Sequence, residues 1–139
     1  LYTITVKTVS GTGVVLPIGS KSLVYSDGTN VSLGIRNKGY VTLNSSTITA
    51  YTAVDGDQIF ANTTANPITV TLPASPPVGS EVTFIDARGT FNSNNLIVNR
   101  NSQPINTGTS NLTIDTNGQA FTLVYVDATR GWAYKTNTA

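Results

Sequence analysis

The chain has 139 residues, 11% of them charged, and its formal net charge is +1. That balance supplies no basic stripe to neutralise phosphates, so it argues against nucleic-acid binding. Cys, His and Met are all absent, which excludes disulfides and a Ser-His-Asp or Cys-His catalytic set. The same absence removes the usual ligands of zinc, haem and iron–sulfur sites, so no cofactor is expected.

Composition also indicates strands and turns. Thr, Asn and Ser together account for 49 residues and Val for 14. Thr and Val are β-branched and fit a pleated sheet, whereas Asn and Ser favour turns. Strong helix formers are scarce, with one Glu and four Lys, so an all-β fold is expected. No apolar run approaches the roughly 20 residues that cross a bilayer, so membrane insertion is not expected.

Short strands and turns alternate through the first 35 residues. Tyr2, Ile4 and Val6 are separated by Thr residues, which is the period of a half-buried strand. Because this expected strand already starts at Leu1, we expect the chain to be a piece of a longer polypeptide. Asp27-Gly28 is a strong hairpin signal. Further strands are expected at Val14–Leu16, Ser22–Tyr25 and Asn30–Ile35, with turns at Gly11–Gly13 and Asn37–Gly39.

The second part of the chain is richer in expected strands. Residues 40–50 are mixed in character and are interpreted as a joint between two units. Beyond it, Glu81–Asp86 should place Val82, Phe84 and Asp86 on one face. Strands are also expected at Gln58–Ala61, Ile68–Leu72, Leu96–Asn99, Leu112–Ile114, Ala120–Val126 and Trp132–Lys135, with a tight turn at Asn117-Gly118. About a dozen short strands at this spacing are typical of a sandwich or barrel.

The chain also contains a self-match. Leu23–Thr29 lies 100 residues before Leu123–Thr129, and the two segments share Leu, Val, Tyr, Asp and Thr at equivalent positions. We therefore expect a partial β-rich repeat at residues 1–45, the C-terminal half of an upstream copy plus the joint. A complete, small antiparallel β-sandwich repeat is expected at residues 46–139. Units that repeat in this way suit serial assembly, as in a fibre.

Several segments together carry a resemblance to a known family. In the second part of the chain they are Ala50–Phe60, Ile68–Pro76, Val78–Asp86, Asn94–Leu96 and Leu123–Trp132, and in the first part they are Gly11–Gly13 and Tyr25–Asn30. With these segments, residues 50–134 resemble a module of tailed-bacteriophage fibre proteins, and Leu1–Val31 resembles another recurring piece of phage tail proteins. The resemblance implies a β-rich, homotrimeric, host-facing virion protein. It does not distinguish a tail fibre from a head fibre, a neck appendage or a baseplate part.

Three aromatic residues are candidate receptor or subunit contacts: Tyr125, Trp132 and Tyr134. Alternation places Trp132 and Tyr134 on the same face of one strand. The three rings could form a platform on which a sugar stacks, but packing over a sheet or against a partner subunit is the favoured interpretation.

The acidic residues offer weaker candidates. Asp55-Gly56-Asp57 could contribute oxygen ligands to Ca²⁺, but it lacks the spacing of an EF-hand loop, and a plain turn is favoured. Asp86 with Arg88, and Asp127 with Arg130, are interpreted as turn or surface ion pairs. Glu81 is the one glutamate, and the Asp residues lie mostly in expected turns, so no enzymatic activity is expected.

Two classes of function remain. The first is a structural component of a bacteriophage virion appendage, a tail fibre or head fibre, that serves assembly and attachment to the host surface. Its partners would be two sister copies in a homotrimer, other virion proteins and a host cell-surface glycan. The alternative is a secreted carbohydrate-binding or adhesin module of a cellular protein.

Overall fold

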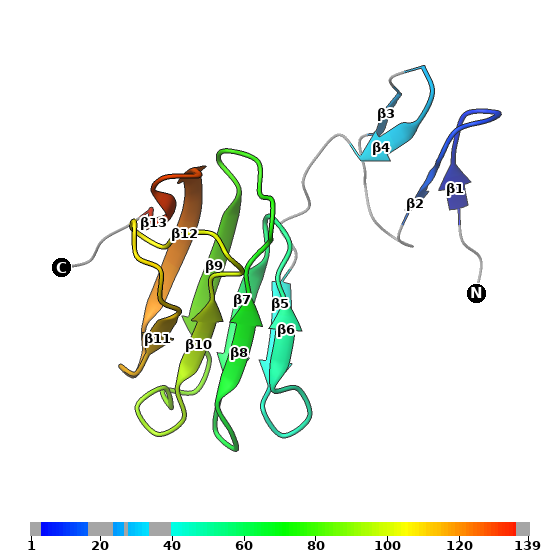
Figure 1. Cartoon of the computed structure of the whole chain (residues 1–139). Helices are drawn as coiled ribbons and strands as arrows, with labels where there is room; N and C mark the ends of the chain where they lie inside the picture. The colour runs from blue at the N-terminus through cyan, green and yellow to red at the C-terminus, as the bar shows by residue number, and fades with distance from the viewer. Residues whose placement is uncertain (1–3, 17–23, 27, 34–39, 136–139) are drawn as a thin grey trace. The chain divides into compact units, whose positions relative to one another are not determined.

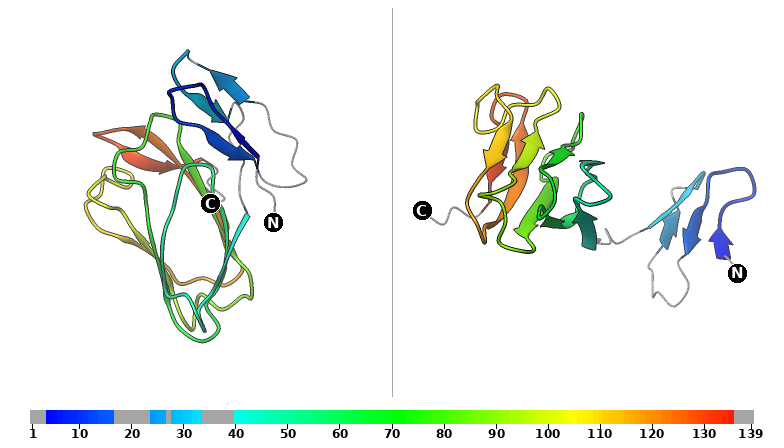
Figure 2. Two further views of the ribbon diagram at one scale, coloured as in Figure 1. Left: turned by 90° about the vertical axis from the view of Figure 1, so that its right-hand side faces the viewer. Right: turned by 90° about the horizontal axis from the view of Figure 1, so that it is seen from below.

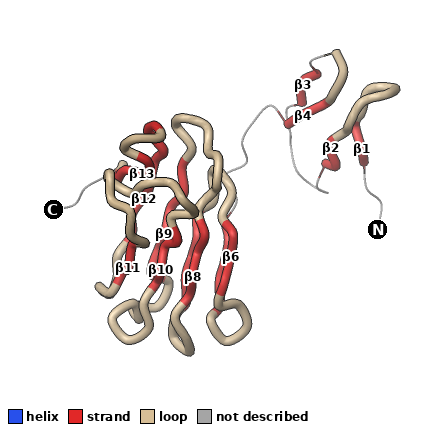
Figure 3. The backbone as a smooth tube through the Cα atoms, in the orientation of Figure 1, coloured by secondary structure: helices blue, strands red, loops and turns tan. Residues whose placement is uncertain are grey.

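The computed structural model describes residues 4–16, 24–26, 28–33 and 40–135. These residues form thirteen strands and no helix, which confirms the all-β expectation (Figures 1 and 3). Within them, therefore, no helix is long and apolar enough to cross a membrane. The chain divides into two compact units, Leu1–Asn37 and Lys38–Ala139.

The first unit contains two antiparallel hairpins. β1 (Ile4–Val6) pairs with β2 (Val14–Leu16), and β3 (Val24–Ser26) pairs with β4 (Val31–Leu33). Thr12 joins them, because its backbone N–H and its Oγ1 both donate to Asn30 Oδ1, at 3.0 and 2.8 Å. The expected strand residues Leu1–Thr3, Ser22 and Leu23, and the expected turn Asn37–Gly39, lie outside the described residues.

The second unit consists of two sheets that lie face to face (Figure 2). One sheet has four strands in the order β11-β10-β8-β6, and the other has five in the order β13-β12-β9-β7-β5. The strands are β5 (Tyr40–Asn44), β6 (Ala50–Thr52), β7 (Gln58–Asn62), β8 (Ile68–Thr71), β9 (Glu81–Asp86), β10 (Leu96–Asn99), β11 (Leu112–Ile114), β12 (Ala120–Asp127) and β13 (Gly131–Tyr134).

The chain winds back and forth between these two sheets. From β5 to β10, each successive strand enters the opposite sheet, so β7 lies beside β5 and β8 lies beside β6. Parallel strands need a long crossover, which is usually a helix. Here the crossover between two parallel neighbours is instead a strand of the facing sheet, as in a β-helix.

This winding corrects the expectation of an antiparallel sandwich. The arrangement is sandwich-like, but four of the seven strand pairings in the second unit are parallel: β5–β7, β7–β9, β6–β8 and β8–β10. The antiparallel pairings, β10–β11, β9–β12 and β12–β13, all involve the last three strands. The alternating pattern specifies which face of a strand is buried, and it is the same for parallel and antiparallel neighbours.

One hydrophobic core lies between the two sheets. Its side chains alternate along the strands, so that Val82 and Phe84 of β9 are buried while Thr83 and Ile85 face outward. This confirms the faces expected for residues 81–86. Asp86 itself is half-buried at the end of the strand. Fully enclosed side chains come from both sheets: Leu43, Ile59, Val82, Phe84, Leu123 and Trp132 from one, and Ile68, Val70, Leu96 and Val98 from the other.

Residues 40–50 do not form a joint outside the second unit. Tyr40–Asn44 is the parallel edge strand β5, and Leu43 is 1% exposed in the core. Compact packing divides the chain after Asn37, whereas the sequence placed the boundary after residue 45. β5 lies at the edge of its sheet, where Thr42 and Asn44 are exposed. Its sequence therefore gives only a weak strand signal.

The described parts of the two self-matching segments include the strand residues Val24–Ser26 of β3 and Leu123–Asp127 of β12. β3 and β12 each pair antiparallel with the strand that follows. In the second copy, the Asp127 carboxylate accepts hydrogen bonds from the N–H groups of Thr129 and Arg130, at 2.8 and 2.7 Å. These hydrogen bonds show that Asp127 closes the turn through backbone contacts. The repeat itself stays a prediction.

Candidate functional site

Two of the three candidate aromatic residues are buried in the second unit. Trp132 is 0% exposed and Tyr125 is 8% exposed. Their rings meet edge to face with centroids 5.5 Å apart, and the Tyr125 hydroxyl lies 3.0 Å from the Gln103 Oε1 to which it donates. Neither ring presents a face to solvent, so these two residues offer no exposed platform for a sugar. A receptor or subunit contact at either residue remains a prediction.

Tyr134 has a different environment. It is half-buried, and its ring and that of Phe121 form a T-shaped pair with centroids 5.6 Å apart. Phe121 stacks in turn on Phe84, 5.1 Å away. Burial raises the pKa of the Tyr134 phenol above the ordinary value of a tyrosine. Tyr134 packs against the core like Trp132, as the alternation along β13 predicts, but it also borders a cavity.

The cavity has a volume of about 620 Å³ and lies where the edges of the two sheets meet. β11 is the edge strand of the four-stranded sheet, and β13 is the edge strand of the five-stranded sheet on the same side. Residues that follow β11 and begin β12 complete the wall. The lining residues are Leu112, Thr113, Ile114, Asp115, Asn117, Gly118, Gln119, Ala120, Phe121 and Tyr134.

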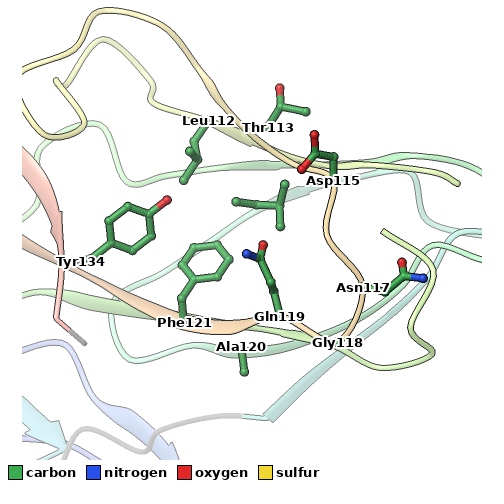
Figure 4. A pocket seen from close by; sticks show the side chains of 10 residues that line it. Leu112, Thr113, Asp115, Asn117, Gly118, Gln119, Ala120, Phe121 and Tyr134 are labelled. Atoms are coloured by element: carbon green, nitrogen blue, oxygen red, sulfur yellow. The ribbon is translucent and has the colours of Figure 1, made fainter. Parts of the chain in front are cut away.

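The lining has an apolar part and a polar part. Figure 4 shows Tyr134, Phe121 and Leu112 on one side of the cavity, with Asp115 and Asn117 on the other. Ligand pockets commonly have volumes of about 300–1,000 Å³, a range that includes this cavity. The cavity therefore combines a surface for an apolar ring face with groups that hydrogen-bond to hydroxyls.

The polar side of the cavity includes the turn Asn117-Gly118 and is called the polar rim below. Asp86 holds this turn in place. Asp86 Oδ2 accepts hydrogen bonds from the N–H groups of Gly118 at 2.9 Å and Phe91 at 3.4 Å. Asp86 Oδ1 accepts three more, from Arg88, Gly89 and Thr90. The carboxylate thus connects the loop that follows β9 to the Asn117-Gly118 turn through backbone hydrogen bonds.

These contacts decide the ionisation of Asp86. Burial raises its pKa, but the backbone N–H groups of Gly118, Arg88, Thr90 and Phe91 stabilise the charged form more strongly, so the net effect is a lowered pKa. In the described structure, Asp86 is therefore a structural carboxylate whose recorded contacts are backbone N–H groups, and not the member of a surface ion pair with Arg88.

The Asn117-Gly118 turn is anchored from a second direction. Asn117 Oδ1 accepts a hydrogen bond of 2.8 Å from the N–H of Asn92. Gly118 has a φ of +73°, a conformation that glycine adopts without a steric penalty. The expected tight turn is therefore present, and it forms one wall of the cavity.

The Asp55-Gly56-Asp57 segment is a turn that is held by hydrogen bonds to the side chains of Asp55 and Asp57. Asp57 Oδ2 accepts from the Tyr51 hydroxyl at 3.0 Å and from the Val54 N–H at 2.9 Å, and Asp55 Oδ1 accepts from the Glu81 N–H at 2.8 Å. Burial and the Asp57 carboxylate raise the pKa of Tyr51. Among the residues with described placement, no group of three or more His, Cys, Asp or Glu side chains could hold a metal ion.

Compared with known proteins, the chain matches no protein-family model and no curated protein. Sequence reasoning identified Tyr134 and the Asn117-Gly118 turn, but not the cavity that joins them. Phe121, Gln119 and Asp115 were missed because their proximity to Tyr134 depends on the meeting of two sheet edges, which no local pattern specifies.

Proposed function

We propose that this chain is a non-enzymatic structural module of a bacteriophage virion appendage, a tail fibre or a head fibre. It serves assembly of the appendage and its attachment to the host surface. In this proposal the module lies on the virion and associates with two sister copies and with other virion proteins.

The observation that carries the proposal is the serial winding of β5–β10. Each turn of the chain adds one strand to each sheet and contacts the turn before it. Architectures of this kind grow in one direction and build elongated bodies, which is what a fibre requires. The same idea is supported by β3 and β12, which carry described parts of the self-matching segments and each pair antiparallel with the strand that follows.

Apolar groups on the outer face of the five-stranded sheet support association with sister copies. Tyr40 is 72% exposed, and its ring stacks on Phe60 with centroids 5.6 Å apart. Phe60 is paired with Ile85 of β9 on the same face. A unit of about 100 residues buries limited apolar surface by itself, and a homotrimer would bury more.

Immunogold labelling of virions with an antibody against this chain tests the proposal. Gold on a tail fibre, head fibre or other appendage is the expected result, and the absence of gold from all virion structures would contradict it. Analytical ultracentrifugation of the intact protein tests the trimer separately. The expected mass is three times that of one chain, and a monomer would overturn the trimer but not the virion location.

The cavity beside Tyr134 favours a second candidate, a secreted carbohydrate-binding or adhesin module of a cellular protein. A ligand pocket with an aromatic wall suits this role as well as it suits attachment of a virus. The same immunogold experiment separates the two, since a cellular adhesin would label the producing cell and not the particle. An assay for polysaccharide degradation by the full protein tests the non-enzymatic part of the proposal.

A further inference from the structure

The charge of the cavity lining restricts its ligand. Among the ten lining residues, Asp115 has the one carboxyl side chain, and none of them is Lys or Arg. A phosphate or carboxylate ligand would meet this carboxylate without a cation to balance it. The lining therefore suits a neutral ligand that accepts and donates hydrogen bonds.

The polar groups of the rim are suited to hydroxyl groups. The Gln119 amide can both donate and accept, and the Asp115 carboxylate accepts. Gln119 is exposed, and no recorded hydrogen bond among the described residues uses its side-chain amide. Asp115 Oδ1 accepts a bond of 3.3 Å from Thr116 Oγ1, which leaves further lone pairs on the carboxylate.

The apolar wall complements this rim. The half-buried ring of Tyr134 lies on the same side of the cavity as Phe121 and Leu112 (Figure 4). A pyranose ring has an apolar C–H face and an edge of hydroxyl groups, and aromatic rings offer an apolar face beside a polar tip. An aromatic wall opposite a rim of hydrogen-bonding groups has the same division.

We infer that this cavity binds a neutral sugar ring, with Tyr134 packing against the C–H face and Gln119 and Asp115 bonding to the hydroxyls. The inference rests on the attachment role proposed above, and it assigns that role to the end of β11, the Asn117-Gly118 turn and Tyr134. The aromatic residue that contacts the sugar is Tyr134 and not the enclosed Trp132.

The site is ordered before the ligand arrives. The Asp86 carboxylate binds the N–H of Gly118, and Asn117 binds the N–H of Asn92, so the turn that carries the rim is fixed to the body at two points. A rim fixed in this way loses little conformational entropy on binding. We therefore expect a sugar to shift the resonances of the rim without reorganising the sheets.

Titration of the isotope-labelled chain with methyl glycosides of glucose, galactose, mannose and N-acetylglucosamine, followed by NMR, tests the inference. At least one glycoside should shift the backbone resonances of residues 113–119 and Tyr134. Tyr134→Ala and Gln119→Ala should each weaken binding about tenfold, the factor that corresponds to ~1.4 kcal/mol. Gln119→Ala is the second variant because it leaves the core intact, and Tyr40→Ala, an exposed tyrosine at the other edge of the sheet, is the matched control.

Each contrary result has a defined meaning. The inference is overturned if none of the four glycosides shifts residues 113–119, or if Tyr40→Ala weakens binding as much as Tyr134→Ala. It is also overturned if Gln119→Ala dissociates an oligomer in analytical ultracentrifugation, since the cavity would then hold a sister copy. Glycoside binding without gold on virions would contradict the proposed virion location and support the sugar site. Gold on virions without glycoside binding would support the virion location and contradict the sugar site.

Discussion

Asp86 and Gly118 are 32 residues apart, and the carboxylate Oδ2 of Asp86 accepts a hydrogen bond of 2.9 Å from the Gly118 N–H. This bond connects the end of β9 to the turn that precedes β12. Because Asp86 also accepts from Arg88, Gly89, Thr90 and Phe91, one charged group satisfies five backbone donors. The wall of the cavity and the β9–β10 loop thus depend on the same carboxylate.

Asp86→Asn should lower the free energy of unfolding by about 1.5–3 kcal/mol at neutral pH, because hydrogen bonds to a charged acceptor are worth more than those to a neutral amide. Urea denaturation measures the change. Asp127→Asn is the matched control, since Asp127 accepts from the N–H groups of two residues within one turn, Thr129 and Arg130. A loss for Asp86→Asn no larger than the loss for Asp127→Asn would contradict this role.

The dependence of stability on pH follows from the lowered pKa of Asp86. A carboxyl group with a lower pKa in the folded state stabilises the fold above its unfolded pKa, and this stabilisation is lost as the pH falls through the folded value. The free energy of unfolding should therefore decrease below about pH 4, the ordinary range of an aspartate. In Asp86→Asn the decrease should be smaller, and an unchanged pH profile would contradict the assignment.

Alanine substitutions at Gly131 and Gly118 distinguish the cost of a steric clash from the cost of backbone strain. Both have positive φ, +71° and +73°. A Cβ at Gly131 would lie 1.8 Å from the carbonyl oxygen of Pro104, whereas a Cβ at Gly118 would meet nothing within 4 Å. Gly118→Ala should cost about 1 kcal/mol of unfolding free energy from backbone strain. Gly131→Ala should cost about 3 kcal/mol or more, and equal costs in thermal denaturation would contradict the close approach to Pro104.

Thr107 offers a stabilising change. Asn106 and Thr107 have φ values of +48° and +69° in a two-residue turn closed by reciprocal backbone bonds between Ile105 and Gly108. Such turns favour Asn-Gly, because the second residue also needs positive φ. Thr107→Gly should therefore raise the free energy of unfolding by about 0.5–1 kcal/mol. Thr109→Gly is the control outside the turn and should not stabilise; denaturation that ranks the two variants the other way would contradict the turn assignment.

Trp132 should behave as an enclosed residue. It is 0% exposed, and its Nε1 has no hydrogen-bond partner among the described residues. Trp132→Ala should cost about 3–5 kcal/mol, whereas Trp132→Phe should cost clearly less because it keeps a ring and removes an unsatisfied donor. Urea denaturation followed by circular dichroism compares the two. Strong quenching of Trp132 fluorescence by iodide in the native protein would contradict its burial.

The sequence predicts most strands and their buried faces, because alternation along a strand is a local property. The buried Val82 and Phe84 of β9 are an example. Pairing is not local, since Ile68 and Leu96 are adjacent in parallel strands although 28 residues separate them. Alternation of the same kind would have fitted antiparallel partners equally well. The prediction of an antiparallel sandwich failed for this reason.

The cavity could be predicted only in part. Tyr134 was identified as a candidate contact from its aromatic type, and the Asn117-Gly118 turn was identified from its residues. Their proximity depends on β11 and β13 being edge strands on the same side of two different sheets. Trp132 attracted attention for the same reason as Tyr134, but its position beside Tyr125 in the register of β12 and β13 encloses it.

The parallel winding of β5–β10 supports the proposed fibre role, and NMR of the labelled chain tests it directly. In a parallel register Val70 lies between Tyr51 and Val98. Nuclear Overhauser effects should therefore connect α-protons of one strand to amide protons of its neighbour in the same sheet, along β6, β8 and β10. Strong α-proton to α-proton contacts between β8 and either neighbour would indicate antiparallel pairing and would contradict the winding.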